Sequence, residues 1–309
     1  MFWSVLIRIT WLLSVLVAVT LIVFVIIHLS GDPTDGFVDP GASPAVRAQI
    51  RQRLRLDDPL PVQYVRFLTH AATGDFGESW RADQPALDLV LDRLGPTLVL
   101  AGMALALAIL VGIGTGLAIV RSRSTVLRGV LGVLISLGQA LPSFWIGATL
   151  VLIFAINLSW VPSSGGDESR SLILPAVTLA LQPAAMIARL AETQLRDALR
   201  SDFVRTARGK GLEERTVFIG HALRSALGPI LGYVSVQIGF MVGGAVIIEG
   251  VFAYPGIGLL ALNAVRDRDL PIIQAFVVTV ALLISMTTLI IDLVARLLDP
   301  RISATGTAP

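Results

Sequence analysis

Six long apolar runs dominate the pattern of hydrophobic and polar positions along the 309-residue chain. They cover roughly residues 9–29, 97–120, 130–156, 172–188, 229–248 and 272–295. A helix needs about 20 apolar residues to cross a bilayer, and most of the runs reach that length. Charged residues make up 15% of the chain, whereas about a quarter is usual in soluble domains. The pattern therefore predicts an all-α membrane protein with six transmembrane helices.

Arginine and lysine are distributed unevenly between the segments that join these runs. The short connection 121–129 carries Arg121, Arg123 and Arg128 and no acid, and the connection 189–228 is also rich in basic residues. The short connections 157–171 and 249–271 carry few. Because basic loops stay on the cytoplasmic side, we expect both termini in the cytoplasm of a bacterium, with the chain crossing its plasma (inner) membrane several times.

The expected organisation has four parts. Residues 1–29 form a cytoplasmic N-terminus and the first transmembrane helix, which we interpret as retained because no small-residue cleavage site follows it. Residues 30–95 form a small external helical segment, with helical stretches within 43–59 and 61–71, a turn at "GDFGESW" that offers Phe76 and Trp80 as anchors, and an amphipathic stretch before Pro96. Residues 96–300 form a five-helix core that includes the cytoplasmic connection 189–228, and 301–309 form a cytoplasmic tail.

Small residues recur at four-residue spacing in two of the runs, as Gly112–Gly116 and Gly239–Gly243. Such pairs let helix backbones approach closely within a bilayer. Each pair by itself indicates no more than general packing of a helical bundle.

Prolines at 142, 175 and 183 fall inside the third and fourth runs, where they are expected to interrupt the helices. Polar or amphipathic residues lie beside these prolines: Gln139, Ser143, Trp145 and Gln182. They either line a polar path through the membrane or make hydrogen bonds between helices. Glu249, at the end of the fifth run, is either a carboxylate at the outer interface or part of an external gate.

Several kinds of chemistry are missing from the sequence. The phosphate-binding pattern G-x-x-x-x-G-K-[ST] needs a lysine before Ser or Thr, but the single lysine, Lys210, precedes Gly211. A single carboxylate, Asp292, falls inside a predicted span, which disfavours ion-coupled transport. The chain has no cysteine and three scattered histidines, so we expect no catalytic residues, bound cofactor or metal. The composition favours a conduit that is driven by another protein.

The charged stretch "VRTARGKGLEERTVFIGHALRSAL" between the fourth and fifth runs breaks the apolar pattern. It predicts two short helices joined at Gly211, because basic residues near the end of the first and acids at the start of the second suit the helix dipoles. Ala207 and Gly211, four residues apart, would give a shallow face. A solvated linker is one interpretation. The other is a docking element for a partner protein, with these contact candidates: Phe203, Val204, Ala207, Arg208, Lys210, Gly211, Leu212 and Glu213.

This stretch resembles the cytoplasmic EAA loop of ABC importer permeases, in which Ala207 and Gly211 match the second alanine and the glycine. Arg205 and Thr206 replace the leading Glu-Ala, in the form typical of the dipeptide/oligopeptide permease family. Other stretches of the chain also resemble that family: "GDFGES", "DRLGPTLVL", "LPSFWIG", "ILPAVTLAL", "EGVFAYPGIG" and "LLDPRI". Glu192 departs from the basic residue that is frequent in the family.

The resemblance implies a type I ABC importer permease fold and places the chain as the first of two permeases. The implied partners are a second, homologous permease chain in a heterodimer, two ABC ATPase subunits that use ATP and Mg, and an external substrate-binding protein or lipoprotein. Membrane lipid surrounds the chain, and we expect no nucleic-acid partner. Di- or oligopeptides are the implied cargo. Alternatives are a metal chelate, an opine or haem as cargo, a self-sufficient secondary transporter or channel, and, as the least favoured, a membrane-embedded enzyme.

Overall fold

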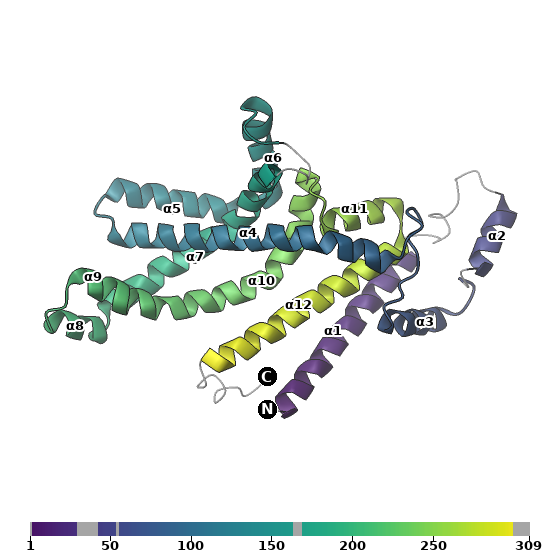
Figure 1. Cartoon of the computed structure of the whole chain (residues 1–309), viewed down its shortest axis with the longest axis horizontal. Coiled ribbons are helices and arrows are strands. Elements are labelled where there is room, and N and C mark those ends of the chain that lie inside the picture. Colours follow the sequence, from purple (N-terminus) through teal and green to yellow (C-terminus); the bar gives the residue numbers. More distant parts are fainter. Residues whose placement is uncertain (1, 30–42, 54–55, 163–168, 299–309) are drawn as a thin grey trace. The chain divides into compact units, whose positions relative to one another are not determined.

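The computed structural model describes residues 2–29, 43–53, 56–162 and 169–298, and in these residues the regular structure is helical (Figure 1). The predicted tail, the segment 30–42 and the side chain of Asp292 lie outside the described part. Up to residue 140, the α-helices are α1 (Phe2–Leu29), α2 (Pro44–Arg53), α3 (Leu60–Ala72), α4 (Ala86–Arg121) and α5 (Thr125–Ala140). They are followed by α6 (Ser143–Leu150), α7 (Ile173–Arg200), α8 (Asp202–Gly209), α9 (Glu214–Thr216), α10 (Arg224–Phe252), α11 (Ile257–Asp267) and α12 (Leu270–Leu298).

The helices confirm an all-α membrane protein, although the count of six spans is not reproduced directly. Among the described residues, four helical segments are long and apolar enough to cross a membrane, and these contain α4, α7, α10 and α12. The bent pair α5 and α6 supplies a fifth if it is counted as one span. The first predicted span is represented by a shorter apolar stretch of α1, Leu13–Ile26.

The third predicted span is not one straight helix. The chain bends by 110° between the helices Thr125–Ala140 and Ser143–Asn157. The second of these consists of α6 and a π-helix over Val151–Asn157. Pro142 lies at the bend, where its missing N–H and its ring prevent α5 from continuing. The interruption predicted from Pro142 is therefore confirmed.

The interruption predicted from the prolines of the fourth span is wrong. Helix α7 runs without a break through Pro183 to Arg200, twelve residues beyond the predicted end of the span. Pro175 lies in the first turn of α7, where an N–H is not needed. Pro183 is buried, so surrounding packing compensates for the one helical hydrogen bond that it removes.

Two units can be distinguished, Met1–Thr97 with Pro255–Pro309, and Leu98–Tyr254. The boundary expected between residues 95 and 96 falls inside α4, because Pro96 lies within this 36-residue helix rather than at its start. The expected amphipathic stretch before Pro96 is thus the first part of α4.

In the second unit, α7 provides a large share of the buried core. Its alanine-rich face packs against glycines of α4 at very short range. A Cβ atom added to Gly116 would lie 2.6 Å from the Cβ of Ala191, and one added to Gly112 would lie 2.7 Å from Ile187. Close packing is therefore the role of this glycine pair. In the other predicted pair, Gly243 faces open space in the single chain.

In the first unit, α1 lies along α12 (Figure 1), and the predicted external helices are found as α2 and α3. The "GDFGESW" turn is ordered, with positive φ at Gly74 and Gly77. Phe76 packs on a small core formed by α4, α11 and α12, which confirms its role as an anchor. The buried hydroxyl of Thr97 accepts a hydrogen bond of 2.9 Å from the backbone N–H of Ile257.

Candidate coupling and translocation site

The charged connection folds as predicted, into short helices on either side of a glycine turn. Helix α8 ends at Gly209, and Gly211 has a φ of 77°, a conformation that favours glycine. Glu213 occupies the N-cap position of α9 without a side-chain capping hydrogen bond, and Glu214 begins the helix. The backbone N–H of Gly211 donates to the carbonyl of Arg208 at 2.9 Å, and that of Leu212 donates to Ala207 at 3.3 Å.

An ion pair spans this turn. The Arg208 guanidinium donates from Nε to Oε1 of Glu214 at 2.7 Å and from an Nη atom to Oε2 at 3.2 Å. The hydrogen bond and the negative charge of Glu214 raise the pKa of Arg208 above its ordinary value. Paired donors of this kind fix geometry as well as charge, so the ion pair links α8 to α9 across Gly211.

The predicted small-residue face at Ala207 is wrong. Ala207 is 5% exposed, and Val204 is fully buried. Both belong to a cluster with Ala198, Val217 and Ala222, so they hold α8 onto the end of α7 and onto the π-helix Val217–Leu223 that precedes α10. An amphipathic helix must cover its apolar side, and here the chain itself supplies that cover.

The other candidates of this connection point away from the cluster. Phe203 is 46% exposed and Leu212 is 40% exposed, although both are large and apolar. Arg208, Lys210, Gly211 and Glu213 are exposed as well. The tip of the connection therefore combines apolar and charged side chains on a shaped backbone, which suits contact with another protein better than a solvated linker does.

Three candidates for the translocation path lie at the bend between α5 and α6. The side-chain nitrogen of Gln139 is buried and finds no hydrogen-bond partner among the described residues. Ser143 begins α6, and Trp145 is 50% exposed. A buried amide without a partner costs free energy unless water or a ligand satisfies it, so Gln139 fits a polar path better than a bond between helices.

The other two candidates are placed differently. Gln182 lies on α7 with its side chain exposed. Glu249, on α10, has an exposed fraction of 0%, so it is not a carboxylate at an exposed helix end. Burial raises the pKa of Tyr254, which follows α10, and the charge of Glu249 acts in the same direction.

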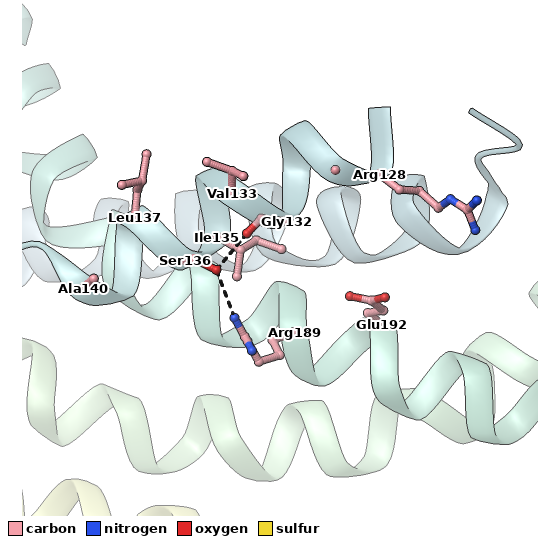
Figure 2. A pocket seen from close by; sticks show the side chains of 10 residues that line it. Arg128, Gly132, Val133, Ile135, Ser136, Leu137, Ala140, Arg189 and Glu192 are labelled. Atoms are coloured by element: carbon pink, nitrogen blue, oxygen red, sulfur yellow. Dashed lines mark hydrogen bonds between the residues drawn. The ribbon is translucent and has the colours of Figure 1, made fainter. Parts of the chain in front are cut away.

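Sequence reasoning missed a groove of about 570 Å³ between α5 and α7. Figure 2 shows Arg189 of α7 directed toward Ser136 of α5, with an Nη atom 3.5 Å from the hydroxyl oxygen. Glu192 also lines the groove, but its Oε1 accepts two hydrogen bonds from Arg196, at 2.8 and 3.0 Å. Glu192, which departs from the family pattern, therefore pairs with Arg196 on the same helix.

The groove was overlooked because Arg189 was assigned to a cytoplasmic connection on the basis of its charge. The sequence nevertheless has a helical pattern of alanines that continues past Arg189. Buried alanines at 184, 188, 191 and 198 keep helical spacing beyond the apolar run. That periodicity predicts a helix that continues past Arg189.

The chain is similar to known membrane transport proteins. The family model described as "Binding-protein-dependent transport system inner membrane component" matches residues 98–304. A Brucella suis protein whose provisional name is peptide permease is 37% identical over 95% of this chain and 96% of its own length. The glutathione transport system permease protein GsiC of Escherichia coli K12 is 35% identical over 96% of this chain and 97% of its own.

The fold has a counterpart among solved structures. An inward-facing structure of the MetNI methionine ABC transporter matches with a TM-score of 0.58 and 15% identity, covering 68% of this chain and 96% of the other. The shared architecture is that of type I ABC importer permeases.

Proposed function

The chain belongs to the family of binding-protein-dependent transport system inner membrane components, as a permease subunit of an ABC importer, and we propose that its cargo is a di- or oligopeptide. The observation that carries this proposal is the likeness, over 95% of the chain, to a protein that carries the name of a peptide permease. The glutathione permease supports it, since glutathione is itself a small peptide. A metal chelate, an opine or haem is the alternative cargo.

The chain forms half of the pathway in this proposal, and a second, homologous permease forms the other half. Gly232 and Gly243 of α10 support a close partner, because a Cβ atom at either would meet no described atom of this chain within 4 Å. Small residues of this kind let another helix approach closely in a membrane. An external binding protein or lipoprotein delivers the cargo.

Two ATPase subunits supply the energy by using ATP and Mg, and the exposed tip between α8 and α9 docks on them. Phe203 and Leu212 provide its apolar contacts, and Arg208, Lys210 and Glu213 its charges, while Gly211 shapes the turn. Val204 and Ala207 support the tip from within. Gln139, Ser143, Trp145 and Gln182 border the pathway, with Glu249 buried behind it.

The protein lies in the bacterial inner membrane with both termini in the cytoplasm. Arg121, Arg123 and Arg128 support this orientation, because they gather near the turn between α4 and α5 without acids. The same orientation places α8 and α9 in the cytoplasm, where the ATPases are.

The test is uptake of labelled glutathione and of labelled di- and tripeptides by proteoliposomes that contain both permeases, the ATPases and the binding protein. We expect uptake that requires ATP inside the vesicles and external binding protein. A complex with an inactive ATPase is the control. Uptake that persists with this control would indicate a secondary transporter, and uptake of a metal chelate, an opine or haem but of no peptide would contradict the proposed cargo.

A further inference from the structure

The pair Ser136 and Arg189 lies deep within the length of the membrane-spanning helices. Helix α7 has 28 residues, about 42 Å at 1.5 Å per residue. Arg189 lies about 24 Å from its start, at Ile173. If a hydrocarbon core of about 30 Å lies anywhere within the helix, Arg189 is inside that core by about 6 Å or more. On this premise the guanidinium lies inside the core but near the end that leads to α8, and Arg128 lines the same groove.

The guanidinium of Arg189 forms no ion pair within the described part of the chain, although the carboxylate of Glu192 and the guanidinium of Arg128 line the same groove. Arg189 lies 3.5 Å from the hydroxyl of Ser136. The nearby Glu192 binds Arg196 through Oε1. A cation at this depth is costly when it faces lipid, so such residues face water, an anion or a partner.

Ser136 holds the guanidinium in place. Its hydroxyl donates to the carbonyl of Gly132 at 3.0 Å, so the hydroxyl oxygen is left to accept from Arg189. Arginine has five N–H donors in a planar fork that matches a carboxylate. One is directed at Ser136, and the others remain for a ligand in the groove.

We propose that the α5–α7 groove borders the aqueous part of the translocation pathway and that Arg189, positioned by Ser136, receives the terminal carboxylate of a passing peptide. The proposal rests on the proposed function, since that supplies the pathway and the class of cargo. A lipid phosphate fits the site less well, because lipid headgroups lie outside the hydrocarbon core in which Arg189 is located.

The absence of cysteine makes the groove directly testable. Ala140 lines the groove one helical turn from Ser136, so Ala140→Cys places a thiol near Arg189 without removing either residue. In the assembled complex, we expect an anionic sulfonate thiosulfonate reagent to label this thiol faster than a cationic trimethylammonium reagent of similar size. Adding Arg189→Gln is expected to reduce the ratio of the two rates by roughly three- to tenfold, since it removes the local positive charge.

The control is Leu134→Cys, an exposed position of α5 that does not line the groove. Its labelling ratio is expected to stay unchanged when Arg189→Gln is added. If neither reagent labels the Ala140→Cys variant in any nucleotide state, the groove is sealed by lipid or by the second permease and the proposal is wrong. Equal rates for the two reagents would overturn the anion preference.

Transport provides the second readout. In proteoliposomes with the partner subunits, Arg189→Gln is expected to lower peptide uptake per ATP hydrolysed at least about fivefold, and Arg189→Lys to restore part of it, because a lysine keeps the charge without the fork. Unchanged uptake in Arg189→Gln, with active wild-type complex, contradicts this subsite alone. Loss of the second permease from the purified Arg189→Gln complex would instead assign the residue to an interface and overturn the proposal. Absence of peptide uptake by the wild type contradicts the proposed function, while the labelling ratio still tests the groove.

Discussion

The hydroxyl of Ser79 donates a hydrogen bond of 2.5 Å to Oδ2 of Asp269, and the two residues are 190 positions apart in sequence. Each has an exposed fraction of 1%. Oδ1 of Asp269 also lies 3.5 Å from the backbone N–H of Ile272, at the start of α12. This contact joins the "GDFGESW" turn to the link between α11 and α12, within one unit of the fold.

Replacing Ser79 with alanine is expected to destabilise the protein by about 1–3 kcal/mol, because a buried carboxylate loses a hydrogen-bond donor. The measurement is thermal unfolding of the detergent-purified complex. Ser225→Ala, at an exposed serine, is the control and is expected to leave the unfolding temperature unchanged. Equal unfolding temperatures for both variants would show that Asp269 does not depend on Ser79.

The glycine contact between α4 and α7 gives a matched pair of variants. Gly116→Ala places a methyl group 2.6 Å from the Cβ of Ala191 and 2.9 Å from the carbonyl oxygen of Ala188, and overpacking of this kind costs about 1–3 kcal/mol. A Cβ atom at Gly114 would meet nothing within 4 Å. Gly114→Ala is therefore expected to be neutral or slightly stabilising. Thermal unfolding compares the two, and equal stability would contradict the close packing.

The ion pair of Arg208 and Glu214 predicts a charge-reversal rescue. Arg208→Glu and Glu214→Arg are each expected to weaken co-purification of the ATPase subunits and ATP hydrolysis stimulated by loaded binding protein, because like charges open the turn. The double variant restores the attraction across the turn and is expected to recover part of the stimulation, because the charge of Arg208 at the contact with the ATPase is not restored. A double variant as inactive as the single ones would show that the ion pair does not shape the turn.

Gly211→Val tests the turn itself. A β-branched residue at a φ of 77° is strained by about 1 kcal/mol or more, so the variant is expected to insert normally and to lose stimulated ATP hydrolysis. Thr216→Val, at an exposed position of α9, is the β-branched control and is expected to be mild. Ala207→Asp, in contrast, disrupts the buried cluster beneath the tip and does not isolate docking. Full stimulation in Gly211→Val would indicate a solvated linker.

The orientation predicts which positions are reached from each side of the membrane. Single cysteines introduced at Ser124, before α5, are expected to react with a membrane-impermeant thiol reagent only after the cells are opened. A cysteine introduced at Asp83, in the external turn, is expected to react in intact cells. Labelling of the Ser124→Cys variant from outside would invert the proposed topology.

The features of this protein that the sequence alone determined depend on local properties of the chain. The apolar runs predicted the helical class, because helices that cross a bilayer must be apolar. The placement of arginines predicted the membrane sidedness, and Gly211 predicted the turn between α8 and α9 because it permits a positive φ. The bend at Pro142 follows from the same local rule. The six family motifs also indicated an ABC importer permease, because each can be recognised in the sequence itself.

Only the tertiary structure decided which side of each helix is covered. Pro96 and Pro183 lie inside continuous helices, although each removes one helical hydrogen bond. Ala207 is buried because α8 folds back onto the end of α7 and the π-helix Val217–Leu223. Arg189 faces Ser136 because α7 continues past its apolar run, and charge alone had assigned it to water. Burial depends on neighbours that are distant in sequence, so no local pattern could specify it.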